Sequence, residues 1–384
     1  MSAEPARLPA VANNDALARE TIRVLDLFSG AGGLTEGFKL ASSVGRSNLV
    51  YSTVRAVESD RAAAATYEAN HGKSKVFAGS IEDWLTIEEV PSADLVIGGP
   101  PCQGFSALGK NDVTDTRNLL WQYYAQTILK SQPKFFVLEN VPQFLRSPQF
   151  TQFQAMCGPG GALSQYSLEA RVLNAAEYGA AQVRKRVIVM GHHRDMSAPG
   201  LPPVKDKYKT PTTWRTLREV LRGLPSEVEG IDLPDRRHEF DGRPLPGIFR
   251  THELHLTRRY TELSLKRFHY IQEGGNRYSL PDELKANCWI NHTTGSGDVM
   301  GRLHWDRPSV TVRTEFFKPE KGRYLHPSEP RALTHHEAAR IQGFGDTYRW
   351  VGSKTAIAKQ IGNAVPVPLG SAIGAHLLSR FSAA

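Results

Sequence analysis

The first half of the chain alternates between short apolar runs and segments with helical spacing. Strands are predicted at residues 22–28, 52–60, 93–101, 134–142, 166–175 and 184–193, and helices after residue 33 and over 61–72 and 118–133. Strands that alternate with helices are typical of a doubly wound α/β domain with a mostly parallel sheet. The pattern therefore predicts one such domain over residues 21–193.

The pattern changes after residue 193. Residues 192–304 contain nine prolines and eight of the thirteen histidines, and strands no longer alternate clearly with helices. Helices are predicted at 258–275, at 334–344 and within 362–381. We therefore predict a mobile N-terminal arm (1–20), the α/β domain (21–193), a smaller inserted domain (194–304), and a return to the first domain with a closing helix (305–384).

Composition narrows the classes of protein. The 384 residues carry a formal net charge of +8, which is compatible with an anionic partner such as nucleic acid. Three cysteines cannot form a disulfide framework, which indicates a reducing compartment. No apolar run approaches the ~20 residues of a membrane span, and residues 1–20 lack the apolar stretch of a secretory signal. Membrane, fibrous and disulfide-stapled proteins are thereby disfavoured.

A glycine-rich turn follows the first predicted strand in DLFSGAGG (26–33). Glycines let the backbone approach a ligand closely, and the amino end of a helix favours negative charge. The dinucleotide fingerprint G-x-G-x-x-G fails at Thr35, so one small anionic group suits the turn better than a pyrophosphate. Glu58, which ends the second strand, can accept hydrogen bonds from ribose hydroxyls, and Phe28 can stack on a flat base. A nucleoside site and a tight turn without a ligand both remain open.

A cysteine follows two prolines in GGPPCQGFS (98–106), at the end of the third predicted strand. Open α/β sheets place their sites at the carboxyl ends of strands. A thiolate at Cys102 would be a strong nucleophile, and the alternative is a small buried apolar residue. Cys157 and Cys288 lack this setting, and no paired Cys and His spacing predicts zinc.

Charged side chains mark two later strands. Glu139 lies where the fourth predicted strand ends, and it can act as a proton donor or be an ordinary surface carboxylate. Period two places Gln182, Arg184 and Arg186 on one face of a strand. Two neighbouring guanidiniums repel unless they hold an anion or a carbonyl-rich ligand, and the alternative is a solvated edge strand.

The chain resembles the cytosine-5 DNA methyltransferase family of restriction–modification systems in eight segments, in the family's unpermuted order over residues 22–381: DLFSGAGG, VESD, GGPPCQGFS, DTRNLL, LENV, QVRKR, RPSVTVR and QIGNAVPVPL. The resemblance implies a Rossmann-like class I methyltransferase fold. It implies S-adenosylmethionine as methyl donor, S-adenosylhomocysteine as product, and no metal. It also implies double-stranded DNA as partner, a monomer in the cytoplasm at the nucleoid, and a cognate restriction endonuclease that acts on the same site.

The resemblance also assigns roles to residues. It implies that Cys102 is the nucleophile, that Glu139 is the acid at the target base, and that Arg184 and Arg186 support it. The family often has an Asp that contacts the adenine amino group where this chain has Ser80, whose hydroxyl can still accept that hydrogen bond. The residues that match the S-adenosylmethionine site are Phe28, Gly30, Gly32, Gly33, Glu58, Ser80, Ile81, Pro100, Leu120, Asn363 and Val365.

The chemistry of this family explains the residue types. Cytosine C5 is not nucleophilic enough to take a methyl group directly, so the Cys102 thiolate would first add to C6. Glu139 would hydrogen-bond or protonate N3, and Arg186 would hold O2 as charge shifts onto the ring. After methyl transfer, loss of the C5 proton and expulsion of the thiolate restore aromaticity. The target cytosine must be flipped out of the base stack for these steps.

The inserted region matches the place of the family's target-recognition domain. Lys and Arg outnumber Asp and Glu there, which suits phosphate contacts. The loop 103–117 is expected to be mobile and to close over DNA. HTTGSGD (292–298) is a candidate for base readout, with an ordinary loop as the alternative. The single residues expected to contact DNA are Gln103, Ser106, Gln182 and Arg277.

Three alternatives accompany this interpretation. The tRNA-modifying branch of the same family carries a Cys-Phe-Thr tripeptide after its ENV motif, where this chain reads ENVPQFLRS. A non-catalytic DNA-binding homologue would be expected to lack Cys102, Glu139 or the arginines, and all are present. A nicotinamide dehydrogenase is disfavoured by the incomplete glycine fingerprint and by the PPC turn.

Overall fold

A seven-stranded sheet forms the centre of the computed structural model, which describes residues 19–44, 48–73, 75–101, 119–228, 230–290, 294–295 and 297–382. The strands lie in the order β3-β2-β1-β4-β5-β7-β6; β1 to β5 are parallel, and β7 is antiparallel to β5 and β6. The predicted doubly wound, mostly parallel α/β fold is confirmed. The strand bounds are β1 Glu20–Leu27, β2 Leu49–Glu58, β3 Val76–Ala78, β4 Leu95–Gly98, β5 Phe135–Asn140, β6 Tyr166–Asn174 and β7 Lys185–His193.

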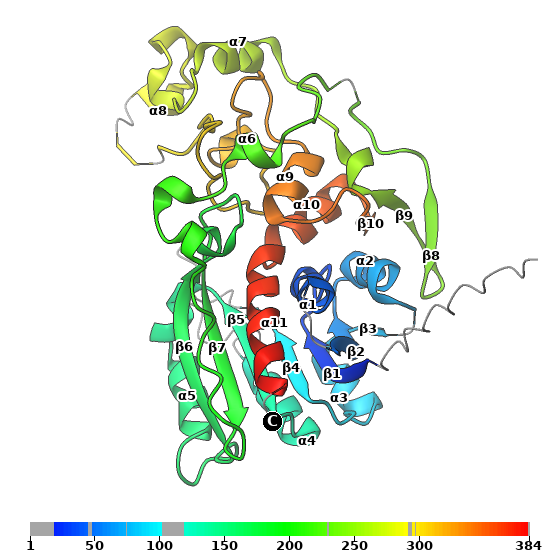
Figure 1. The fold of residues 1–384 in the computed structure, drawn as a ribbon. Helices are drawn as coiled ribbons and strands as arrows, with labels where there is room; N and C mark the ends of the chain where they lie inside the picture. The colour runs from blue at the N-terminus through cyan, green and yellow to red at the C-terminus, as the bar shows by residue number, and fades with distance from the viewer. Residues whose placement is uncertain are drawn as a thin grey trace, which may run out of the picture.

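Alternate residues of the central strands face two helical layers, because successive side chains of a strand point to opposite faces. Val24 and Ile97 pack on one face, and Leu25 and Val96 pack on the other. The first face is covered by α1 (Gly33–Val44) and α11 (Val367–Phe381), and the second by α3 (Ile81–Ile87), α4 (Leu120–Ser131) and α5 (Pro148–Met156), as Figure 1 shows.

Helices α1 and α11 touch through their backbones. A Cβ placed on Gly37 would lie 2.6 Å from the Ser371 backbone nitrogen and 2.7 Å from Gly370 Cα. Farther along, a Cβ on Gly374 would lie 3.1 Å from Phe38 Cα. Glycines on both helices thus permit a close approach that larger residues would prevent. The contact joins the helix that begins at the glycine-rich turn to the helix that ends the chain.

The region after residue 193 shares its core with the C-terminal segment. Strands β8 (Arg237–Phe240) and β9 (Arg243–Arg250) form a second sheet with β10 (Arg349–Val351). Phe249 and Leu303 pack in one cluster with Val312 and Ile341. The predicted boundary between residues 304 and 305 therefore does not coincide with a break in the core. The remaining helices are α2 (Arg61–His71), α6 (Leu217–Val220), α7 (Glu262–Tyr270), α8 (Asn287–Ile290), α9 (His335–Gln342) and α10 (Lys354–Asn363).

Most predicted elements are present, with shifted ends. The helix predicted at 258–275 is shorter, since Thr261 caps α7 by accepting a hydrogen bond from Ser264 N–H at 3.2 Å. Sequence patterns missed β3, the three strands of the second sheet, and the helices α3, α5, α6, α8 and α10. The predicted arm lies almost wholly outside the described residues, and so does the predicted loop 103–117.

In the described part of the chain no single helix has the length and apolarity needed to cross a membrane. By length and composition alone, α10 and α11 pass that test as a pair, but they are bent by 42° at the break between them.

We predict that Gly37→Ala destabilises the protein by about 1–3 kcal/mol, because the new methyl group forces α1 and α11 apart. In an ordinary helix interior the same change would stabilise by roughly 0.5–1 kcal/mol. Unfolding in urea measures the difference. Gly345→Ala is the control, since a Cβ there meets nothing within 4 Å. A Gly37→Ala protein as stable as the wild type would contradict the close contact.

Candidate active site

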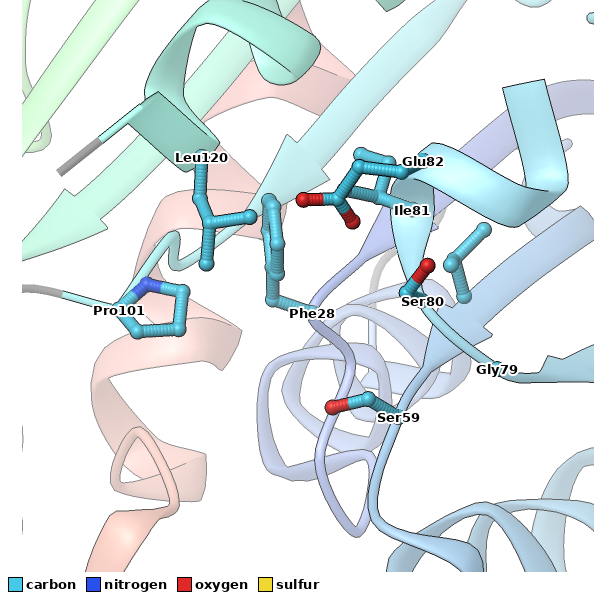
Figure 2. Close-up of a pocket in the computed structure, with 9 residues that line it drawn as sticks. Phe28, Ser59, Gly79, Ser80, Ile81, Glu82, Pro101 and Leu120 are labelled. Carbon is cyan, nitrogen blue, oxygen red and sulfur yellow. The ribbon is translucent and has the colours of Figure 1, made fainter. Parts of the chain in front are cut away.

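A pocket of about 220 Å³ opens at the carboxyl ends of four neighbouring parallel strands, β3, β2, β1 and β4. Parallel strands end at one edge of a sheet, so the residues that follow them meet there. Figure 2 shows the ring of Phe28 between Leu120 and Ile81. The lining residues are Phe28, Val57, Ser59, Gly79, Ser80, Ile81, Glu82, Pro101 and Leu120.

The turn after β1 leaves room for a ligand. Gly30 and Gly32 have φ of 55° and 84°, in the left-handed region that glycine tolerates best. A Cβ on Gly32 would lie 2.5 Å from His71 Nε2, whereas a Cβ on Gly30 would meet nothing within 4 Å. The buried Ser29 Oγ has no hydrogen-bond partner among the described residues. Open space and an unused polar atom therefore lie at the predicted turn.

Glu58 orders this turn through its carboxylate. It accepts hydrogen bonds from Gly30 N–H at 2.8 Å and from Asp60 N–H at 2.6 Å. Burial raises the pKa of Glu58, and these two backbone hydrogen bonds act in the opposite direction. Because a carboxylate oxygen has more than one acceptor site, the geometry still permits the predicted contact with ribose hydroxyls.

Ser80 caps α3 and also lines the pocket. Its Oγ accepts a hydrogen bond from Asp83 N–H at 3.0 Å and donates to Asp83 Oδ2 at 2.8 Å. A hydroxyl has two acceptor lone pairs, so one of them stays available to an amino group. The predicted adenine contact would therefore be compatible with the cap.

Pro101 lines the pocket, whereas the predicted Pro100 is buried behind it. The Pro100 C=O accepts a hydrogen bond from Asn140 Nδ2 at 3.1 Å. Asn140 Oδ1 in turn accepts from Val141 N–H at 2.7 Å. The Asn140 side chain, next to Glu139, thus holds the backbone at Pro100, two residues before Cys102.

The C-terminal segment packs beside the start of α1. A Cβ on Gly33 would lie 2.8 Å from Val365 O, so the two backbones are in contact. Val365 is buried, Asn363 is exposed, and neither lines the pocket. The predicted cofactor residues therefore form two groups, one around the pocket and one at Gly33.

Glu139 and Arg186 form an ion pair at the same edge of the sheet. Arg186 Nε lies 2.8 Å from Glu139 Oε1, and the two side chains are 16% and 13% exposed. Glu139 pairs with Ile188 across the antiparallel strands β5 and β7, which sets Arg186 diagonally beside it. A Cβ on Gly99 would lie 2.9 Å from Glu139 Oε2, so the carboxylate lies against the turn that leads to Cys102.

Arg184 and Gln182 lie deeper than the sequence pattern indicated. Arg184 is buried and donates to Val312 O and Gly362 O, both at 2.9 Å. Burial, with the charge of Arg186, lowers the pKa of Arg184 to about 9, so the guanidinium stays charged at neutral pH. Gln182 is fully buried and bonds to protein groups, which does not leave it free for the expected DNA contact.

Arg277, another expected DNA contact, is buried, and its Nη2 donates to Gly295 O at 3.0 Å and to Tyr278 Oη at 3.1 Å. In this arrangement the guanidinium is held by protein groups, and its contact with DNA stays a prediction. Three residues with predicted roles, Cys102, Gln103 and Ser106, lie outside the described residues, as do parts of 292–298.

Sequence reasoning did not single out Asp26, a buried residue of β1 that is hydrogen-bonded to the first turn of α1. It accepts a hydrogen bond from the Thr35 hydroxyl, the residue that breaks the dinucleotide fingerprint. Thr35 Oγ1 lies 3.2 Å from Tyr67 Oη, which donates to Thr53 Oγ1 at 3.1 Å. Burial raises the pKa of Asp26 to about 7. The signal in the sequence that could have pointed to Asp26 is an acidic residue within an otherwise apolar predicted strand.

Among the residues that the structure describes, no group of three or more His, Cys, Asp or Glu side chains could hold a metal ion. Cys157 is buried, and burial raises its pKa to about 11; Cys288 is exposed.

Comparisons with known proteins identify the family of this chain. The family model of C-5 cytosine-specific DNA methylases matches residues 22–379. The Type II methyltransferase M.XorII of Xanthomonas oryzae pv. oryzae is 30% identical, with 92% of this chain and 84% of that protein covered. The Type II methyltransferase M.DdeI of Desulfomicrobium norvegicum is also 30% identical, with 93% and 88% covered.

Solved structures share the fold. An Escherichia coli prophage protein assigned as a DNA modification methyltransferase superposes with a TM-score of 0.67 at 22% identity, over 94% of this chain and 99% of that one. A Dnmt2 methyltransferase from S. pombe superposes with a TM-score of 0.55 at 16% identity, over 94% and 99%.

The chain belongs to the C-5 cytosine-specific DNA methylase family. It is a DNA cytosine-5 methyltransferase whose curated relatives are the modification enzymes of Type II restriction–modification systems. The family resemblance inferred from eight sequence segments is thereby confirmed. Use of S-adenosylmethionine and of DNA follows from family membership.

We predict that Asp26 makes stability depend on pH. Its folded pKa of about 7 lies above the ordinary value of 3.8, so the folded state keeps a proton that the unfolded state loses. The stabilising contribution is therefore full below about pH 4 and is lost as pH rises through about 7. Asp26→Asn should flatten this part of the profile in urea unfolding at pH 5 to 8.

The exposed Asp206→Asn provides the control for this experiment and should retain the wild-type profile. Wild-type pH dependence in Asp26→Asn would show that another group is responsible.

Proposed function

We propose that this enzyme methylates C5 of a flipped-out cytosine within a specific double-stranded DNA sequence, through a covalent bond between Cys102 and C6. One observation carries the proposal: the Glu139–Arg186 pair, at 2.8 Å, lies at the sheet edge that also bears the pocket. Pro101, which lines that pocket, immediately precedes Cys102 in the sequence. An acid and a cation at this edge, with a cysteine next in the sequence after Pro101, are the groups that addition to a pyrimidine requires.

The pocket fits the adenosine part of S-adenosylmethionine. The side chains of Phe28, Ile81 and Leu120 offer apolar contact to a flat base, while Ser80 and Glu58 supply acceptors nearby. Its volume of about 220 Å³ is less than the roughly 300–1,000 Å³ of pockets that enclose a whole drug-sized ligand. We therefore place the rest of the donor along the turn at Gly30, where the backbone has open space.

The donor, when bound, supplies an electrophilic methyl group on a sulfonium sulfur. Cys102 would form a bond from sulfur to C6, and the electron pair of the C5–C6 double bond would move toward C5. Glu139 would hold or donate a proton at N3, and the Arg186 guanidinium would hold O2 as negative charge develops. After methylation, removal of the C5 proton would let the C6–sulfur bond break and would restore the aromatic ring.

We assign DNA sequence recognition to the region between β7 and residue 304. It carries α7 and α8, which Figure 1 shows at the end of the molecule opposite the large sheet. Tyr278 is 42% exposed there, over the buried Arg277 guanidinium at 4.7 Å. An endonuclease that acts on the same DNA site fits the Type II relatives and belongs to the proposal.

We predict that a duplex with 5-fluorodeoxycytidine at the target position traps the enzyme. Fluorine cannot leave C5 as a proton does, so the C6–sulfur bond persists. The site is first mapped as genome-wide 5-methylcytosine in a host that expresses the chain. The trapped adduct appears as a slower band on a denaturing gel when the protein, the donor and the duplex are combined.

Cys102→Ala should abolish the band and methyl transfer while DNA binding persists. Cys288→Ala, at an exposed cysteine, should trap as the wild type does. A band with Cys102→Ala, or none with the active wild type, would refute the covalent step. Methylation of a tRNA transcript in place of the duplex would instead indicate the tRNA-modifying branch.

We predict that Phe28→Ala weakens S-adenosylhomocysteine binding by about two- to thirteen-fold, because aromatic stacking contributes roughly 0.5–1.5 kcal/mol. Isothermal titration measures the dissociation constant. Phe317→Ala removes another half-buried ring outside the pocket and is the control. Unchanged affinity in Phe28→Ala would place the nucleoside elsewhere.

A further inference from the structure

A chain of buried amides connects three segments that are distant in sequence. Gln182 Oε1 accepts a hydrogen bond from Val312 N–H at 3.2 Å, and Gln182 Nε2 donates to Gln342 Oε1 at 2.5 Å. Gln342 Nε2 then donates to Ile361 O and to Ala364 O, the latter at 3.3 Å. Both glutamines are fully buried. Bulk solvent therefore does not reach these groups.

The donor-to-acceptor direction of these amide hydrogen bonds is fixed at both ends. Val312 N–H can only donate, so the Gln182 oxygen must face it. Ile361 O can only accept, so the Gln342 nitrogen must face that carbonyl. Each amide is thus held in one of its two flipped orientations, and removal of either glutamine leaves buried backbone groups without a partner.

Arg184 makes a second connection in parallel with the first. It donates to Val312 O and Gly362 O, both at 2.9 Å, from a position two residues after Gln182. The N–H and the C=O of Val312 are therefore both held by side chains of the QVRKR segment. The Thr311 hydroxyl adds a hydrogen bond to Val183 O at 2.8 Å.

These donors serve the carboxyl end of α10, which ends at Asn363. The last carbonyls of a helix have no partner within it and need donors from elsewhere. The carbonyls of residues 361, 362 and 364 receive theirs from Gln342 and Arg184. Asn363 and Val365 lie in this segment, and Val365 O contacts the start of α1 at Gly33.

The other end of the network leads to the target-base side of the site. Arg186 follows Arg184 by two residues on the same strand segment and holds Glu139 at 2.8 Å. The backbone of residues 182–186, with the hydrogen bonds of Gln182 and Arg184 and the ion pair of Arg186, therefore joins Glu139 to the segment that flanks the glycine-rich turn.

We propose that Gln342 is a positioning residue for methyl transfer: with Gln182 and Arg184 it sets the 361–365 segment at the donor side relative to the Glu139–Arg186 pair at the base side. The inference rests on the proposed function, since that function assigns the methyl donor to one end of the network and the target base to the other. Small misplacement of reacting groups can lower a rate by up to about a hundred-fold. Loss of this set of hydrogen bonds should therefore affect catalysis beyond its effect on stability.

Gln342→Met tests this, because it conserves shape and removes the hydrogen bonds. We expect kcat to fall about ten- to a hundred-fold, and S-adenosylhomocysteine to bind more weakly in isothermal titration. Affinity for the target duplex should stay close to that of the wild type. Gln342→Glu keeps the acceptor but loses the donor, and should show the same loss.

The matched control is Gln360→Met. Gln360 is a buried glutamine on α10 whose Nε2 donates to Val351 O at 2.9 Å, outside the network. The Gln360→Met protein should lose about as much stability in urea as Gln342→Met does, but it should retain wild-type kcat and S-adenosylhomocysteine affinity. Equal kinetic losses in Gln342→Met and Gln360→Met would reduce Gln342 to a structural residue and overturn the inference. Wild-type kinetics in Gln342→Met would overturn it as well.

A double-mutant cycle gives an independent readout. If Gln182 and Gln342 act as one chain, Gln182→Met with Gln342→Met should lower kcat by less than the product of the two single effects. Multiplying effects would contradict the chain. Failure of the wild type to bind S-adenosylhomocysteine or to methylate DNA would instead refute the proposed function, so the two failures are distinguishable.

Discussion

The reversal of one strand determines how this site is assembled. In a parallel sheet only carboxyl ends reach the edge where ligands bind. Because β7 runs antiparallel to β5, its amino end reaches the same edge as the carboxyl end of β5. Glu139 and Arg186 therefore come from opposite ends of neighbouring strands and meet there. The pocket on β1 to β4 and the acid–cation pair on β5 and β7 occupy adjacent parts of one edge.

Local patterns predicted six of the seven strands of the large sheet and singled out Phe28 at its edge, whereas Ser80, Ile81 and Leu120 came from the family resemblance. Strands end at Leu27 and Gly98, and a glycine follows each within three residues. The residues at these ends, Phe28 and Pro101, line the pocket because strand ends are adjacent in any parallel sheet. Ser80 illustrates a limit: its position was predicted, but its role in capping α3 depends on Asp83, within a helix that the pattern missed.

Burial could not be predicted where distant segments create it. Period two correctly groups Gln182 with Arg184, yet both are covered by residues near 312 and 362, more than a hundred positions away. The inserted region shows the same effect, since β9 pairs with β10 from the C-terminal segment. A boundary drawn from composition at residue 304 divides a core that Phe249 and Ile341 share. The inserted region and the C-terminal segment are thus built on common packing.

The Asn140 side chain has a consequence for the turn that follows β4. Its amide binds the Pro100 carbonyl, so the backbone on the amino side of Cys102 is fastened to the strand that carries Glu139. The turn after β4 and the end of β5 are thereby held in one fixed relation, so a shift of the Pro100 backbone would have to break the hydrogen bond to Asn140 or carry the neighbouring Glu139 along with it.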